Sequence, residues 1–164
     1  MHVLLLVLVL ALVSKTSWGR KIVKFCGEYA GPLAFLTALA ALVGSLFYSE
    51  VVGYEPCVLC WWQRIFLYPL VPIFGLALWQ RTRDAFSYAI PLATLSLIVS
   101  AYQVYANLGL GSLLPCTAVG GACSKVYVLA FGYITIPVMS LTISLIILLL
   151  AWVKKVYDQD SYAR

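Results

Sequence analysis

Four long apolar stretches leave this chain few ways to fold. They cover residues 30–48, 61–79, 85–105 and 131–153, and the only charged side chain in them is Arg64, in the second. Each stretch is close to the roughly 20 helical residues that cross the hydrocarbon core of a bilayer. None has the alternating pattern of a barrel strand. The sequence therefore predicts an all-α integral membrane protein, a four-transmembrane-helix bundle forming a single domain.

The overall composition agrees with this prediction. Hydrophobic residues make up 63% of the 164 residues and charged residues only 10%, whereas a soluble domain carries about 25% charged residues. Lipid is therefore the expected main solvent, and we expect a multi-pass protein of the cell membrane.

The positions of the basic residues account for the net charge of +5. Nine of them lie in the segments on one side of a four-pass chain: Lys15, Arg20, Lys21, Lys24, Arg81, Arg83, Lys154, Lys155 and Arg164. The opposite side carries Lys125, Glu50 and Glu55. The positive-inside rule then predicts that both termini are cytoplasmic. Because the charge reports topology, no nucleic-acid partner is expected.

The amino-terminal segment fits this scheme least well. Residues 3–13 form an apolar run that is too short for an ordinary span. The run also lacks the basic flank and the small-residue cleavage site of a signal peptide. We interpret it as an interfacial segment or an extension from an upstream start codon. Residues 1–25 are therefore an extension of uncertain role, and residues 26–164 form the transmembrane domain.

Cys57 and Cys60 form a C-x-x-C pair in the first loop on the less basic side of the predicted bundle. Pro56 favours an extended residue before it, so the second helix is expected to begin near Cys57. The helix dipole would then favour a thiolate in this first turn. The pair can be a redox dithiol, a structural disulfide or half of a zinc site. Zinc would need all four cysteines of this side or a histidine, and the only histidine is His2; no metal site is predicted.

A second pair, Cys116 and Cys123, lies in the other loop of the same side, with six residues between the thiols. Taken alone, this pair is typical of a structural disulfide within a loop. Two pairs on one face can instead exchange disulfides through a mixed-disulfide intermediate. Cys26 lies on the opposite side and is interpreted as a spare reduced thiol.

Arg64 follows Cys60 by four residues, so the two share a helix face. An arginine near a helix end can snorkel to headgroups, or it can serve a function inside the membrane. As a functional group it would stabilise a Cys60 thiolate and donate to a carbonyl of a membrane-dissolved oxidant, with Gln63 assisting. The sequence has no haem, iron–sulfur or nucleotide motif, so elimination favours a quinone as the electron acceptor.

Several runs resemble the disulfide bond formation protein B (DsbB) family, particularly its shorter BdbC-like members. They are Ser49-Glu50-Val51, Pro56-Cys57-Val58-Leu59-Cys60-Trp61-Trp62-Gln63-Arg64, Tyr68-Pro69 and Phe131-Gly132-Tyr133-Ile134-Thr135-Ile136-Pro137. The resemblance implies a four-helix bundle that reoxidises an extracytoplasmic thioredoxin-like dithiol oxidase (DsbA- or BdbD-like) and reduces ubiquinone or menaquinone.

The resemblance also implies a role for each site residue. Cys116 would form the mixed disulfide with the partner, Cys123 would exchange with Cys57, and Cys60 would react with the quinone. Arg64 would polarise that quinone, with Gln63 beside it. The spacing of the second pair is shorter than in the long-loop enteric members, which leaves the assignments of Cys116 and Cys123 open.

Two other functions are compatible with the cysteine pattern. A vitamin K epoxide reductase-like enzyme also joins loop cysteines to an intramembrane C-x-x-C and a quinone, but there the loop pair precedes the C-x-x-C, whereas here it follows. A membrane scaffold with two structural disulfides would need neither a quinone nor Arg64. The spacing of Cys60 and Arg64 favours the enzyme.

Overall fold

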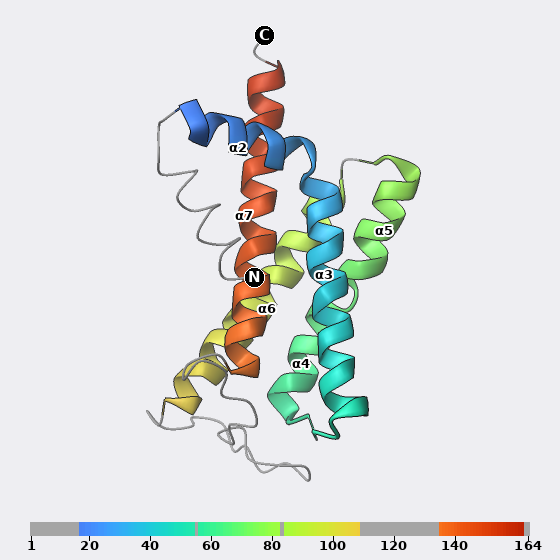
Figure 1. Ribbon diagram of the computed structural model, residues 1–164, viewed down its shortest axis with the longest axis vertical. Coiled ribbons are helices and arrows are strands. Elements are labelled where there is room, and N and C mark those ends of the chain that lie inside the picture. The colour runs from blue at the N-terminus through green and yellow to red at the C-terminus, as the bar shows by residue number, and fades with distance from the viewer. Residues whose placement is uncertain (1–16, 55, 83, 109–134, 163–164) are drawn as a thin grey trace.

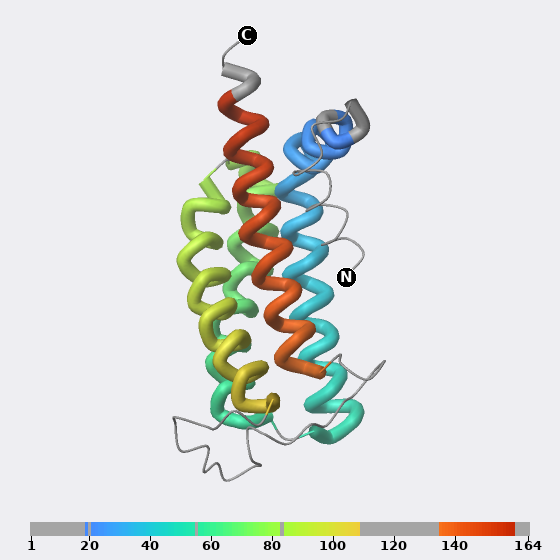
Figure 2. The backbone as a smooth tube through the Cα atoms, turned by 90° about the vertical axis from the view of Figure 1, so that its left-hand side faces the viewer, coloured from blue at the N-terminus to red at the C-terminus, as the bar shows by residue number. Residues whose placement is uncertain are grey.

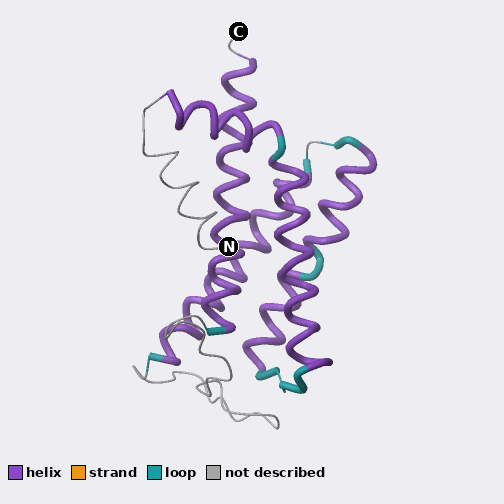
Figure 3. Tube along the Cα trace, viewed as in Figure 1, coloured by secondary structure: helices purple, strands orange, loops and turns teal. Residues whose placement is uncertain are grey.

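The structure is a computed structural model that describes residues 17–54, 56–82, 84–108 and 135–162. Over these residues the regular secondary structure is entirely helical (Figure 3). The helices are α2 (Ser17–Glu28), α3 (Ala30–Leu46), the π-helix η1 (Phe47–Val51), α4 (Val58–Leu67), α5 (Leu70–Gln80), α6 (Ala85–Asn107) and α7 (Ile136–Tyr162). The predicted all-α class is thereby confirmed.

Four helical segments are long and apolar enough to cross a membrane: Ala30–Val51, Val58–Gln80, Ala85–Asn107 and Ile136–Gln159. They run alternately up and down and lie side by side along one axis (Figures 1 and 2). The predicted four-helix membrane bundle is therefore confirmed.

The last span begins later than the sequence suggested. Thr135 is not helical and α7 starts at Ile136, whereas the predicted span began at residue 131; residues 131–134 lie outside the described residues. The carbonyl of Thr135 accepts the first helical hydrogen bond from the amide of Met139 at 3.0 Å. Pro137 is tolerated next to this start because the amides of a first turn have no partner within the helix.

The bundle has two distinct ends (Figure 1). η1, the start of α4, the end of α6 and the start of α7 meet at the lower end, which we call the site end. The opposite end, which we call the α2 end, holds α2, the end of α5 and the end of α7. α2 lies across α7 there. Residues 17–25, which the sequence left in an extension of uncertain role, are therefore part of a helix that packs on the bundle.

A close contact holds α2 against α7. A Cβ atom placed on Gly27 would lie 2.6 Å from the Cβ of Tyr157, so only glycine fits without a shift of the helices. Cys26 is buried beside it, 6% exposed.

Small side chains bring the spans close together in the core. Five alanines of α3 and α6 are almost fully buried against large aliphatic residues of α7: Ala30, Ala34, Ala38, Ala89 and Ala93. Two hydroxyl pairs also join α6 to α7, Ser100 with Ser140 and Ser144 with Ser96, both at 3.0 Å. Close backbone approach and interhelical hydrogen bonds are the forces that hold helices together in lipid.

The second span is interrupted between α4 and α5 at Tyr68 and Pro69 (Figure 3). Pro69 has no amide hydrogen to donate to the preceding turn. The chain resumes with bonds from Val71 to the Tyr68 carbonyl at 3.2 Å and from Ile73 to the Pro69 carbonyl at 3.1 Å. The ten residues of α4 therefore form a short helix of their own at the site end.

Candidate active site

Cys57 caps the amino terminus of α4. Its backbone is extended, with φ −70° and ψ 169°, and its sulfur accepts a hydrogen bond from the amide of Cys60 at 3.4 Å. α4 begins at the next residue, Val58, which confirms the predicted helix start. Both thiols therefore lie where the free amides and the helix dipole favour negative charge on sulfur.

The two sulfurs of this pair lie 3.0 Å apart, and no disulfide bond joins them in the structure. Cys57 is buried, with 4% of its surface exposed, whereas Cys60 is half-buried. A dithiol with its sulfurs in contact can close to a disulfide with little movement of the backbone.

A cavity of about 240 Å³ adjoins the sulfurs. Its walls come from α3, η1, α4, α6 and α7, and most of them are apolar. Cys57, Cys60, Gln63 and Arg64 all contribute to the wall. A mostly apolar cavity with a few convergent polar groups is typical of a small-molecule site.

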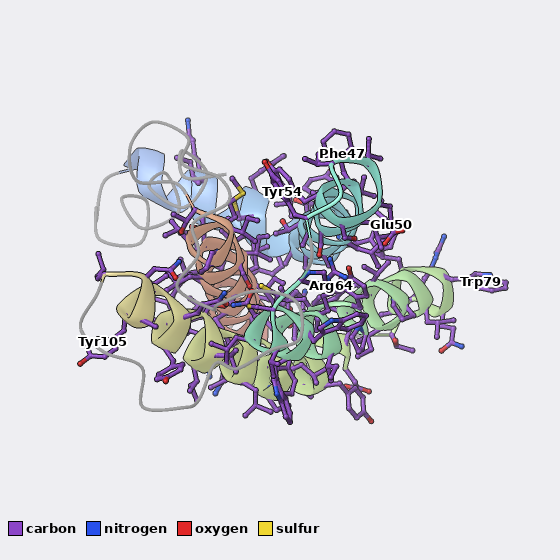
Figure 4. The ribbon with its side chains drawn as sticks, turned by 90° about the horizontal axis from the view of Figure 1, so that it is seen from below. Phe47, Glu50, Tyr54, Arg64, Trp79 and Tyr105 are labelled. Atoms are coloured by element: carbon purple, nitrogen blue, oxygen red, sulfur yellow. The ribbon has the colours of Figure 1, made fainter. Side chains whose placement is uncertain are left out.

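Arg64 is held inside the bundle by α3. Its Nε donates to the Ser45 hydroxyl at 3.0 Å, and its Nη2 donates to the Ser45 carbonyl at 3.2 Å. The Tyr68 hydroxyl donates to the hydroxyl oxygen of Ser45 at 3.1 Å. The guanidinium of Arg64 lies 5.3 Å from the centre of the Trp61 ring. Viewed from the site end, Arg64 lies among the helices, whereas Trp79 points outward (Figure 4). These contacts favour a function in the cavity over simple snorkelling.

Gln63 and Gln103 form a buried amide pair between α4 and α6. Gln63 Nε2 donates to Gln103 Oε1 at 2.7 Å. Gln103 Nε2 in turn lies 3.4 Å from the sulfur of Cys57 and 3.5 Å from that of Cys60. The sequence suggested that Gln63 would assist at the oxidant; the structure joins it to the dithiol through Gln103.

Sequence reasoning missed Gln103, Ser45 and Asn107. Each is a polar side chain of the cavity wall that lies within or at the end of an apolar span. The buried Oδ1 of Asn107 has no hydrogen-bond partner among the residues that the structure describes. Isolated amides in apolar spans were the available signal, because a polar group in lipid has to be satisfied by a neighbour.

Aromatic residues near the ends of membrane helices are typical of the membrane interface, but Tyr54 lies at the cavity instead. Its ring stacks on that of Tyr48, with centroids 6.1 Å apart, and both line the cavity. Gly53, at φ +76°, makes the turn that brings the Tyr54 amide within 3.0 Å of the Tyr48 carbonyl. Trp61 and Trp62 are about half exposed on the outside of the bundle, as is typical of aromatic residues at a membrane interface.

Cys26 is separated from this centre. Cys26 lies on α2, at the opposite end of the bundle (Figure 1). Cys116 and Cys123 lie outside the described residues, so their approach to Cys57 stays a prediction.

Fold and site together define a multi-pass membrane protein with a dithiol centre at one end of a helical bundle. A protein-family model described as disulfide bond formation protein DsbB matches residues 28–154, and the chain belongs to this family. It is therefore a membrane oxidoreductase of disulfide bond formation.

Individual relatives agree with the family assignment. The chain is 34% identical over 134 residues to the probable disulfide formation protein C 2 of Bacillus anthracis, covering 82% of this chain and 96% of the relative. It is 37% identical over 118 residues to the disulfide bond formation protein C of Bacillus subtilis (strain 168), covering 71% and 85%. A probable disulfide formation protein of Metapseudomonas resinovorans is 36% identical over 120 residues, covering 72% and 83%. No solved structure gives a significant match.

Proposed function

We propose that this protein is a thiol:quinone oxidoreductase that oxidises the Cys57–Cys60 dithiol and passes the electrons to a membrane quinone. The observation that carries the proposal is that both sulfurs and the Arg64 guanidinium lie on the wall of one apolar cavity. A redox pair that only stabilised the fold would have no need of such a cavity.

The cavity suits a quinone ring in size and polarity. An apolar cavity of about 150 Å³ is large enough to admit benzene, and this one measures about 240 Å³. Its apolar walls match a lipid-soluble ring. The guanidinium of Arg64 has N–H groups beyond the two that bond to Ser45, and these would donate to a carbonyl oxygen.

The electrons and protons of the reaction balance. Closing the Cys57–Cys60 disulfide forms one S–S bond and releases two electrons and two protons. A bound quinone supplies the two-electron acceptor and leaves as the quinol. Cys60 is the more exposed of the two sulfurs, so its thiolate is assigned to face the acceptor. Arg64, one helical turn further along α4, would stabilise negative charge on the acceptor oxygen.

The electrons are proposed to reach this centre from a thioredoxin-like dithiol oxidase. The partner's thiolate would attack Cys116 and break the Cys116–Cys123 disulfide, and Cys123 would then attack Cys57 and release Cys60 as a thiolate. The partner's second thiolate would close the partner's disulfide and free Cys116, which would attack Cys123 and release Cys57 as a thiolate. The names of the relatives, which describe disulfide bond formation, support a partner of this kind.

Charge supports an extracytoplasmic placement of the site end. Described basic residues gather at the α2 end or beside it: Lys21, Lys24, Arg81, Lys154 and Lys155. Glu50, in contrast, belongs to η1 at the site end. Under the positive-inside rule the α2 end, with both termini, would face the cytoplasm.

The experiment is a stopped-flow record of quinone absorbance with purified protein, a reduced thioredoxin-like oxidase and a water-soluble quinone. Wild type should consume quinone in step with partner oxidation, and Cys60→Ser should consume none. Cys26→Ser is the matched control, because it removes a thiol at the opposite end of the bundle, and it should behave as wild type. If folded wild type binds the partner and consumes no quinone, the proposed acceptor is wrong.

A further inference from the structure

The amide of Gln103 is the polar group from α6 that reaches both sulfurs of the dithiol. Its nitrogen lies 3.4 Å from Cys57 Sγ and 3.5 Å from Cys60 Sγ, within the usual range for a donor to sulfur. Gln103 is 3% exposed, so water has little access to it. The two hydrogens of one amide group are thus available to the two sulfurs of one redox pair.

A second amide fixes which way Gln103 faces. Gln63 Nε2 donates to Gln103 Oε1 at 2.7 Å, which commits the oxygen of Gln103 to α4 and turns its NH₂ group toward the sulfurs. Gln63 is itself only 5% exposed. Burying two amides costs free energy unless their polar atoms are paired, so the bond between them offsets this cost and holds Gln103 in one orientation.

We infer that Gln103 is a catalytic residue of the dithiol centre and that Gln63 is the residue that positions it. The amide of Gln103 hydrogen-bonds to Cys57 and Cys60 and stabilises the thiolate on whichever sulfur carries the charge. The role of Gln103 in turnover rests on the proposed function. Its contact with the sulfurs does not depend on the identity of the electron acceptor.

A donor shared by both sulfurs matches the sequence of charges in disulfide exchange. When an incoming thiolate attacks Cys57, the Cys57–Cys60 bond breaks and Cys60 leaves as a thiolate. When the second thiolate of the same dithiol attacks the mixed disulfide, Cys57 leaves as a thiolate in turn. The negative charge therefore appears on each sulfur at a different step. Gln103 stands within reach of both, so neither thiolate is left in the bundle without this donor.

The test is the pH dependence of alkylation at Cys57 and Cys60 in reduced, detergent-solubilised full-length protein. A short pulse of iodoacetamide is followed by mass spectrometry of the peptide that contains both cysteines, so the other cysteines do not interfere. Gln103→Met keeps the length of the side chain and removes the donor. Gln103→Glu keeps its shape and replaces the donor with a carboxylate. Ser96→Ala is the matched control, because it removes a buried polar contact between α6 and α7 without touching the sulfurs.

Only the thiolate reacts, and a hydrogen bond to a charged group typically changes an equilibrium about tenfold or more. At neutral pH, Gln103→Met should therefore alkylate at least about tenfold more slowly than wild type. Gln103→Glu should also be slower than wild type at every pH at which its carboxyl is ionised, because that charge repels a thiolate. As the pH rises, the rate ratio between the variants and wild type should shrink, because a larger fraction of every variant is ionised; a change in access alone would leave the ratio constant. Ser96→Ala should follow wild type throughout.

An alkylation profile of Gln103→Met that coincides with wild type, or an equal loss in Ser96→Ala, would overturn the inference. Should Gln103→Met fail to fold, Gln63→Met provides the same test, because it removes the hydrogen bond that orients Gln103. The alkylation rate should then fall in the same direction by a smaller factor. An unchanged profile would count against the inference. Quinone consumption by wild type is measured separately. Its absence would remove the proposed acceptor while leaving the alkylation result to decide the role of Gln103.

Discussion

Ser45 accepts two hydrogen bonds from Arg64: its hydroxyl accepts from Nε at 3.0 Å, and its carbonyl accepts from Nη2 at 3.2 Å. This contact joins α3 to α4 on the cavity wall and sets the direction of the guanidinium. A serine on the first span thus controls the orientation of the one cation within the second span.

Ser45→Ala should weaken quinone use by loosening that orientation. The hydroxyl accepts from both Arg64 and Tyr68, and each bond is worth about 1 kcal/mol. We expect KM for quinone to rise about fivefold to tenfold, with partner oxidation in the absence of quinone unchanged. Steady-state kinetics with a soluble quinone measures this. Thr94→Ala removes an exposed hydroxyl that bonds within its own helix and should leave KM at the wild-type value. Equal KM values for both variants would contradict the assigned role of Ser45.

Replacing Arg64 should separate quinone reduction from partner docking. Arg64→Ala removes the charged donor from the cavity, and hydrogen bonds to charged groups are worth about 1.5–3 kcal/mol. Quinone reduction should fall about tenfold to a hundredfold while the partner still binds. Arg64→Lys keeps the charge and loses the planar fork, so intermediate activity is expected. Single-turnover quinone absorbance and a separate binding measurement check this; parallel loss of both steps would show that Arg64 mainly supports the fold.

Cys26 should stay a thiol to a higher pH in the folded protein than in the denatured protein. Burial raises the pKa of the Cys26 thiol above its ordinary value, and only the thiolate is nucleophilic. In the folded protein its alkylation should therefore rise at a higher pH than in the denatured protein. Peptide mass spectrometry after a timed iodoacetamide pulse at a series of pH values measures this. Coincident folded and denatured profiles would show that Cys26 is not buried as described.

Gly27→Ala should destabilise the α2 end without affecting the chemistry. The added Cβ would lie 2.6 Å from the Cβ of Tyr157, and overpacking of this kind costs about 1–3 kcal/mol. We expect a lower thermal unfolding midpoint in detergent, with KM for quinone unchanged. Gly44→Ala is the matched control, because no atom lies within 4 Å of the added Cβ. An unfolding midpoint equal to that of wild type would mean that α2 shifts to accommodate the added methyl group at little cost in stability.

The spans and the dithiol could be predicted from sequence because both depend on residues that are close together in the chain. A run of apolar residues is enough to mark a membrane helix, and the spacing of Cys57, Cys60 and Arg64 is enough to place them on one helix. The start of α7 was placed too early, since an apolar run does not show where a helix is capped.

The supporting contacts could not be predicted in the same way. Gln63 and Gln103 are separated by 40 positions in the chain, and Ser45 and Arg64 by 19. Such pairs depend on how the helices rotate against one another, which local periodicity does not record. The helix ahead of the first span was likewise not predicted, and its position on the bundle depends on Gly27 meeting Tyr157 on α7.

The dithiol, the cavity and Arg64 all lie at the same end of the bundle, while α2 and the end of α7 occupy the other. Reducing equivalents that enter and leave at one end never traverse the thickness of the bilayer. Moving one charge across a membrane costs about 2.3 kcal/mol per 100 mV, and this layout avoids that work. Turnover in sealed vesicles should therefore proceed at the same rate whether or not a voltage is imposed across the lipid.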